Sequence, residues 1–250
     1  MSIGETWTTR REYSPDRFRR LAEAAPAGSP YGERAERLCE ALAGSPYRVD
    51  PLGGAPGEPE ALSVSLCAFD CVTFVEEVTA FAASTSEEDF LARLRRIRYE
   101  QGQVDYFRRR HYFSQWLSGN AAEGQLALLE IPGLPHRVWP RTLSVLPALG
   151  PQPASVRGWP KTSFPRLRPQ VRSGDVAAFV STRRDLDYFH TGLLIVRGSS
   201  ILLAHAARSA GAVVIVPLPE FLRARRMSGL TVARPWPDRP DVSRPQEARP

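Results

Sequence analysis

Near Gly174 the pattern of apolar residues changes from helical spacing to short strand-like runs, and this change constrains the fold most strongly. The apolar runs that follow it have strand length and are separated by turn residues: 175–181, 188–196, 200–206, 212–216 and 230–233. One short helix is expected at 219–226. Helices first and strands later predict an α+β fold, with N-terminal helices packed on a C-terminal antiparallel β-sheet.

The helices expected before this point have recognisable starts or stops, such as the Ser14-Pro15 pair. Their expected ranges are 14–24, 33–43, 70–83 and a helix that begins at 86. Residues 46–59 predict a loop, and the proline-punctuated stretch 120–172 contains one possible strand at 143–146. We therefore expect one domain over 14–236, followed by a disordered tail at 237–250 that is rich in Pro, Asp and Arg.

Composition excludes several classes of protein. An apolar fraction of 42% and a charged fraction of 24% are ordinary for a globular chain. No run is long and apolar enough for a membrane span, and the N-terminus has no secretory apolar region, so we expect a cytoplasmic protein. The net charge of +6 is almost wholly arginine, because Lys161 is the only lysine. The arginine clusters lack interleaved stacking aromatics, so we expect solvated helix faces and no nucleic-acid partner.

Cys71 lies in the first turn of the helix expected at 70–83, where Asp70 can cap the helix start. The positive end of a helix favours a thiolate over a thiol, which is the form that attacks an acyl group. A free cysteine is more often a small buried residue, and we interpret Cys39 and Cys67 in that way. The position of Cys71 favours a nucleophile.

Two histidines occur in consecutive strand-like runs. A two-residue turn at Gly198-Ser199 would place His205 opposite Gly192 and on the same face as His190. Such diagonal neighbours are about 7–8 Å apart, within reach of large side chains. A strand-borne imidazole can act as base and then as acid for a cysteine nucleophile.

Zinc is the main alternative for these residues, because Cys67, Cys71, His190 and His205 could supply four ligands. Two cysteines four positions apart on one helix are not a common zinc pattern, however, and the histidines are distant in sequence. Three cysteines imply no disulfide framework, and phosphate-loop and dinucleotide fingerprints are absent. We expect neither a metal nor a cofactor.

Several segments match, in order, the motifs of one family. They are 69–76 (fDCvTfVE), 94–102 (L-x-x-iRY-x-x-G), 109–116 (R-x-HY-x-s-D-W), 173–176 (the sheet-opening GD), 186–192 (LD-x-x-HvG), 203–206 (LHA) and 229–235 (G-I-x-V-x-RP). On these motifs the chain resembles the NlpC/P60-like amidase family once catalogued as DUF1460. The resemblance implies a papain-like fold without cofactor and cleavage of the amide between N-acetylmuramic acid and L-alanine in muropeptides.

Carried over from this resemblance, Cys71 is the nucleophile, His190 the general base and acid, and His205 the residue that orients His190. The candidate substrate-binding residues are Asp70, Arg109, His111, Tyr112, Trp116 and Asp187. For Trp116, packing within the helix layer is an equally good interpretation.

The chain departs from the family pattern at Gln115, where the family usually has Asp, and at Arg208, where it prefers Ser. These departures leave open an amide-forming acyltransferase of secondary metabolism that uses the same Cys-His site. A non-catalytic binding module is a further alternative. Many members of the family are exported, whereas this chain shows no signal peptide.

Overall fold

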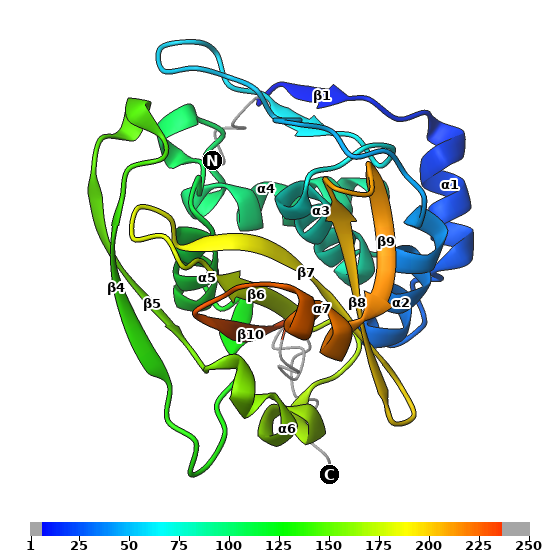
Figure 1. The fold of residues 1–250 in the computed structure, drawn as a ribbon. Coiled ribbons are helices and arrows are strands. Elements are labelled where there is room, and N and C mark those ends of the chain that lie inside the picture. Colours follow the sequence, from blue (N-terminus) through cyan, green and yellow to red (C-terminus); the bar gives the residue numbers. More distant parts are fainter. Residues whose placement is uncertain (1–6, 237–250) are drawn as a thin grey trace, which may run out of the picture.

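The computed structural model describes residues 7–236, so the tail expected at 237–250 lies outside the described residues. Within this range the helices come mainly first and an antiparallel sheet follows, which confirms the predicted α+β class (Figure 1). The α-helices are α1 (Pro15–Ala24), α2 (Tyr31–Leu42), α3 (Cys71–Ala83), α4 (Glu87–Arg98), α5 (Phe113–Ala122), α6 (Phe164–Leu167) and α7 (Leu218–Ala224). None of these described helices is long and apolar enough to cross a membrane.

A six-stranded antiparallel sheet forms the second half of the molecule, with the strand order β3-β10-β6-β7-β8-β9. Its strands are β3 (Leu126–Leu128), β6 (Val176–Val180), β7 (Tyr188–Arg197), β8 (Ser200–Ala207), β9 (Ala212–Pro217) and β10 (Gly229–Pro235). The strands predicted after Gly174 are confirmed to within two residues at each end. The edge strand β3 was not predicted, because it lies in the stretch where prolines obscure the pattern.

Two further pairs of strands lie outside this sheet. The strands β1 (Thr9–Arg11) and β2 (Leu62–Val64) pair in parallel, and β4 (Arg137–Leu143) forms an antiparallel pair with β5 (Gln152–Gly158). The strand expected at 143–146 is therefore wrong in its position, since β4 ends where that strand was expected to begin.

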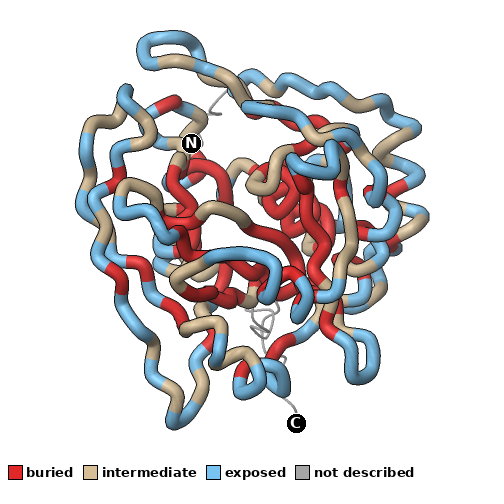
Figure 2. Tube along the Cα trace, viewed as in Figure 1, coloured by how far each residue is buried: buried red, intermediate tan, exposed pale blue. Residues whose placement is uncertain are grey.

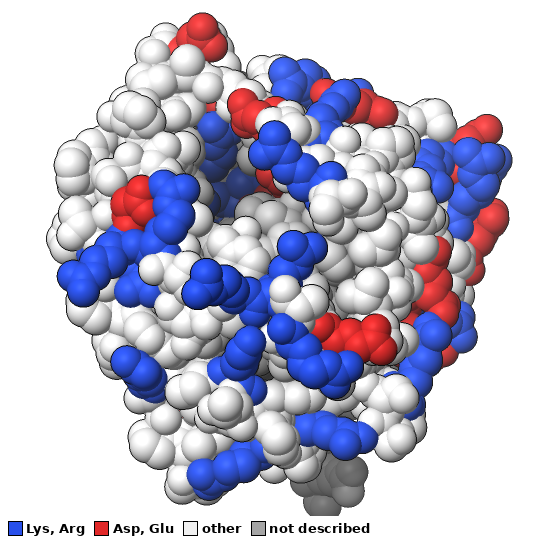
Figure 3. All heavy atoms as spheres, viewed as in Figure 1, with Lys and Arg blue, Asp and Glu red and all other residues white. Residues whose placement is uncertain are grey.

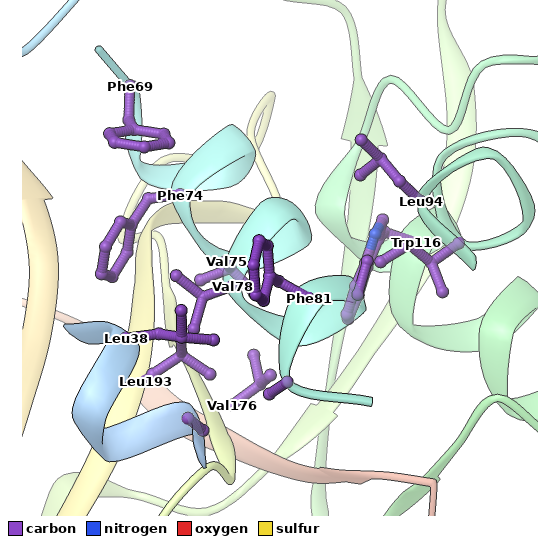
Figure 4. Packing of buried hydrophobic residues seen from close by; sticks show 14 of the residues in the cluster. Leu38, Phe69, Phe74, Val75, Val78, Phe81, Leu94, Trp116, Val176 and Leu193 are labelled. Carbon is purple, nitrogen blue, oxygen red and sulfur yellow. The ribbon is translucent and has the colours of Figure 1, made fainter. Parts of the chain in front are cut away.

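The sheet is buried on both faces, as the red segments of Figure 2 show. On one face, Phe74, Val78 and Phe81 of α3 pack in the same cluster as Leu193 of β7 and Val176 of β6 (Figure 4). Each such side chain contributes about 1.5–3 kcal/mol when it is removed from water. A second apolar cluster, which includes residues of α6 and α7, covers the other face.

The strands β7 and β8 are paired along only part of their length. Their ladder runs from Arg197 opposite Ser200 to Leu193 opposite Ala204. Beyond that point β7 stays paired with β6, and β8 stays paired with β9. In Figure 1 the two strands diverge, with α3 between them. This separation of β7 and β8 positions the candidate site.

Candidate active site

A reciprocal set of hydrogen bonds fixes the start of α3. The Oδ1 atom of Asp70 accepts the N–H groups of Val72 (3.1 Å) and Thr73 (2.7 Å). In return, the Thr73 hydroxyl oxygen accepts the N–H of Asp70 at 3.0 Å. This capping box satisfies backbone donors that would otherwise be orphaned and makes Cys71 the first residue of the helix. Asp70 therefore holds the nucleophile candidate in place.

The thiol of Cys71 lies at the separation of β7 and β8. The backbone N–H of Thr191, the residue after His190, lies near its sulfur and opposes the rise in the pKa of the thiol. Leu194 donates its N–H to Asp175 on the β6 side, so the alternation of an antiparallel strand directs the N–H of Thr191 to the opposite side, where β8 has moved away. Cys71 therefore occupies the position that a paired strand would otherwise fill.

The two histidines contact each other directly. The Nε2 atom of His190 lies 2.7 Å from the Nδ1 atom of His205, and the rings are nearly perpendicular, at 86°. The turn at Gly198-Ser199 places Arg197 opposite Ser200, which confirms the register expected from the sequence. Both imidazoles lie on one face of the strand pair. Because Nε2 of His190 is engaged, its Nδ1 atom is the ring nitrogen left for the substrate or the thiol.

Burial keeps the Cys71 thiol and the His190 imidazole neutral. It raises the pKa of the Cys71 thiol to about 12, with a further contribution from the charge of Asp70. It lowers the pKa of His190 to about 3, assisted by His205 and Arg225. The preformed thiolate expected at the helix start is therefore wrong, because desolvation outweighs the N–H groups that face the sulfur. At neutral pH the site holds a thiol and an imidazole.

The other cysteines differ from each other in exposure. Cys39 is buried, as expected, and burial raises the pKa of its thiol. Cys67 is exposed, so its interpretation as a core residue is wrong. It precedes α3 in a segment whose other residues, such as Leu66 and Phe69, are largely buried. Within 7–236, no three His, Cys, Asp or Glu side chains are grouped in a way that could hold a metal ion, so the zinc set that included Cys67 is not assembled there.

A cleft of about 440 Å³ begins at the start of α3, and we call it the Cys-side cleft. Its lining includes Asp70, Val72, Arg98, Arg109 and His111. Figure 3 shows a hollow on the face viewed in Figure 1, with Lys and Arg side chains in its wall. Cationic groups of this kind can bind an anionic or strongly polar part of a ligand.

Arg109 and His111 line this cleft, as expected, but both have partners within the protein. The guanidinium of Arg109 pairs with Glu60 at 3.1 Å and donates to the carbonyl oxygen of Gly53 at 2.9 Å. The Nε2 atom of His111 lies 2.6 Å from the carbonyl oxygen of Tyr106. These contacts fix the orientation of both side chains in the wall of the cleft.

The other three candidates are Trp116, Tyr112 and Asp187. They line neither the Cys-side cleft nor the pocket beside the two histidines. Trp116 is 1% exposed and stacks on Phe113 at 4.9 Å within the core, the alternative considered for it from the sequence (Figure 4). The buried hydroxyl of Tyr112 accepts the N–H of Leu146 at 3.3 Å. The carboxylate of Asp187 accepts the N–H of Ser114, at 2.7 Å, in the first turn of α5. These contacts give the three side chains roles in packing and capping, and their assignment to substrate binding stays a prediction.

A second pocket, of about 360 Å³, opens beside the histidine pair, and we call it the His-side pocket. It is lined by Phe189, His190, His205, Ala207, Arg208, Ser209, Phe221 and Arg225. Sequence reasoning missed Phe221 and Arg225, because α7 and the residue that follows it approach the histidines only through the tertiary fold. Apart from the two histidines, only Arg208 among the lining residues stood out in the sequence, as a departure from the family pattern.

Comparison with known proteins identifies one family model and several similar solved structures. Residues 37–129 match the model of a family described as AmiA-like, N-acetylmuramoyl-L-alanine amidase-like. A comparison with curated proteins gives no match.

Among solved structures, this fold is similar to an N-acetylmuramoyl-L-alanine amidase from Bacteroides uniformis, with a TM-score of 0.72, 24% identity, and coverage of 82% of this chain and 98% of that one. A second crystal structure of an amidase described in the same words gives a TM-score of 0.71 and 25% identity, over 82% of this chain and 98% of that one. A Legionella pneumophila protein with the DUF1460 family model gives a TM-score of 0.73 and 19% identity, over 90% of this chain and 95% of that one. These likenesses establish the fold and suggest an amidase-like enzyme.

Proposed function

We propose that this protein is a papain-like cysteine amidase of the NlpC/P60 type, which hydrolyses the amide between N-acetylmuramic acid and L-alanine through a thioester on Cys71. The observation that carries the proposal is the hydrogen bond between His190 and His205, together with the placement of Cys71 beside the strand that carries His190. An orienting partner on one ring nitrogen leaves the other nitrogen to move a proton.

Because both groups rest in their neutral forms, proton transfer accompanies attack. The Cys71 sulfur attacks the amide carbonyl carbon while Nδ1 of His190 takes the thiol proton. The N–H of His190 at Nε2 then donates to Nδ1 of His205, which fixes the tautomer. His190 next protonates the leaving nitrogen, the C–N bond breaks, and the amine departs. Water, activated by His190, attacks the thioester and releases the acid and the thiol.

The helix start supplies electrostatic stabilisation for the oxyanion. Asp70 engages the N–H groups of Val72 and Thr73, so the N–H of Cys71 is the first-turn donor left for the substrate oxygen. An N–H aimed at a developing oxyanion in a desolvated site lowers the barrier, and removing such a donor typically costs about 10²–10³ in kcat.

The test is hydrolysis of N-acetylmuramoyl-L-alanyl peptides, followed by mass spectrometry of the products. Wild-type protein should release a peptide with L-alanine at its N-terminus, and Cys71→Ser should abolish release while the protein stays folded. Cys67→Ser is the matched control, because Cys67 is exposed and should not affect turnover. Product in the Cys71→Ser variant would refute the thioester route. Product formed only with an added amine would favour the acyltransferase alternative.

A further inference from the structure

The direction of the substrate follows from the proton that the leaving nitrogen must receive. A general acid has to lie within about 2.6–3.2 Å of the atom it protonates. His190 is that acid in the proposed function, on which this inference rests, so the amine product leaves on the side of His190. His190 and His205 line the His-side pocket, whereas the start of α3 lines the Cys-side cleft. The acyl part then lies along the Cys-side cleft, and the amine product occupies the His-side pocket.

The His-side pocket combines apolar walls with two exposed cations. Phe189 and Phe221 provide aromatic surface, and the guanidinium of Arg225 lies 6.0 Å from the centre of the Phe221 ring. Neither Arg208 nor Arg225 forms an ion pair with a carboxylate in the described part of the chain. Arg225 lines the pocket together with both histidines, and its charge helps to lower their pKa values.

We propose that Arg208 and Arg225 bind a carboxylate on the amine product, so that the enzyme selects amides whose leaving group is an anionic amino acid or peptide. Guanidinium groups match the geometry of a carboxylate and form charge-assisted hydrogen bonds with it. The aromatic walls accommodate a small apolar side chain between the scissile nitrogen and the carboxylate. Arg208 is the position where the sequence departs from the serine of the family pattern, so this specificity is a property of this chain.

The first experiment measures alkylation of the cysteines and does not depend on amidase activity. Iodoacetate and iodoacetamide react at the same carbon and release iodide, but only iodoacetate carries a carboxylate. At each cysteine, the rate of alkylation by iodoacetate is divided by the rate with iodoacetamide. The value of this ratio at Cys71, divided by its value at the exposed Cys67, is a quotient that reports the anion preference of the site. Arg208→Ser with Arg225→Gln should lower this quotient about fivefold, as expected for two exposed charges.

Arg223→Gln is the matched control, because Arg223 is exposed on α7 and does not line the pocket. It should leave the quotient unchanged. High salt should reduce the preference in wild-type protein, since exposed charges are screened. An equal quotient in wild type and the double variant would overturn the proposed carboxylate site.

The second experiment compares the hydrolysis of N-acetylmuramoyl-L-alanine with that of its alaninamide. Wild type should prefer the free acid in kcat/KM, and the double variant should lose the preference mainly through KM. Equal rates for acid and amide in wild type would overturn the carboxylate site while the proposed function stands. No hydrolysis of either compound, together with the expected alkylation result, would overturn the proposed function and still support the carboxylate site.

Discussion

Glu77 provides a sharp test of how burial controls ionisation in the helix that carries the nucleophile. Glu77 is 1% exposed, and its carboxylate accepts hydrogen bonds from the N–H groups of Ser65 (3.2 Å) and Leu66 (2.8 Å). Leu66 has a φ of 50°, a left-handed conformation that costs a non-glycine residue about 1–2 kcal/mol. Glu77 therefore stabilises a strained turn that leads into α3.

Burial raises the pKa of Glu77 from 4.5 to about 7, although Arg98 and the two N–H groups oppose the change. The folded protein thus binds this proton more tightly than the unfolded chain. Ionisation of Glu77 therefore lowers stability as the pH rises from 4.5 towards 7, and the full cost applies above pH 7. At about 1.4 kcal/mol per pH unit, that cost is about 3 kcal/mol.

Glu77→Gln removes the ionisation and keeps an oxygen that can accept one of the two N–H groups. Between pH 5 and pH 8, the free energy of unfolding of wild type should fall by about 2–3 kcal/mol relative to this variant. Urea unfolding at the two pH values measures the difference, since other titrating groups cancel in the comparison. Glu23→Gln, on the exposed side of α1, should follow wild type. The same difference between wild type and Glu77→Gln at both pH values would refute the argument.

Three further predictions concern the site and its support. His190→Ala should lower kcat more than His205→Ala does, because an orienting group is less essential than the proton carrier; equal losses in steady-state assays would contradict these roles. With the pKa of Cys71 at about 12 and that of His190 at about 3, kcat/KM should be flat from pH 5 to pH 9, and an inflection near pH 8 would indicate a thiol that ionises alone. Arg98→Met should lower the free energy of unfolding, measured in urea, by about 3–5 kcal/mol, because it removes the partner that lies 2.7 Å from the buried Glu76. Adding Glu76→Gln should recover part of this loss, and strictly additive losses would argue against coupling between the two residues.

The parts of the site that the sequence predicts correctly depend on local rules. The helix start at Cys71 follows from the capping ability of Asp70, and the shared face of the histidines follows from the two-residue turn at Gly198-Ser199. The capping residues are three positions apart, and the two histidines are 15 positions apart across a single hairpin. Local capping and turn chemistry are therefore sufficient to assemble the pair of imidazoles.

The parts that the sequence misses depend on contacts between distant segments. The apolar stripe of α3 consists of Phe74, Val78 and Phe81. Glu76 and Glu77 lie off this stripe, a position that predicts exposed side chains, yet both are buried. Arg98, at the end of α4, pairs with Glu76, and the backbone N–H of Leu66 donates to Glu77. No spacing within α3 reveals those partners. The raised pKa of Cys71 has the same origin, because helix position favours the thiolate and only the tertiary fold determines desolvation.

In the proposed mechanism, the divergence of β7 and β8 lets one sheet serve both sides of the scissile bond. Gly192 lies where the two strands begin to separate, and a Cβ there would meet the carbonyl oxygen of Ala204 at 2.6 Å and the Cβ of His205 at 3.0 Å. The absent side chain lets the strands approach closely just before they diverge. The start of α3 then enters from one face, while the histidines lie on the other.

In the proposed mechanism, the neutral resting state of Cys71 and His190 determines which step the site has to assist. A buried imidazole with a pKa of about 3 is a weak base but a strong acid once protonated, so it transfers its proton readily to the leaving nitrogen. Attack by the thiol is consequently the more demanding step, because it creates charge in a desolvated site. The donors lie where that charge develops: the N–H of Thr191 at the sulfur and the first turn of α3 at the oxyanion. The same burial that suppresses the thiolate at rest strengthens these dipoles during attack, so the site stabilises charge in the transition state rather than in the free enzyme.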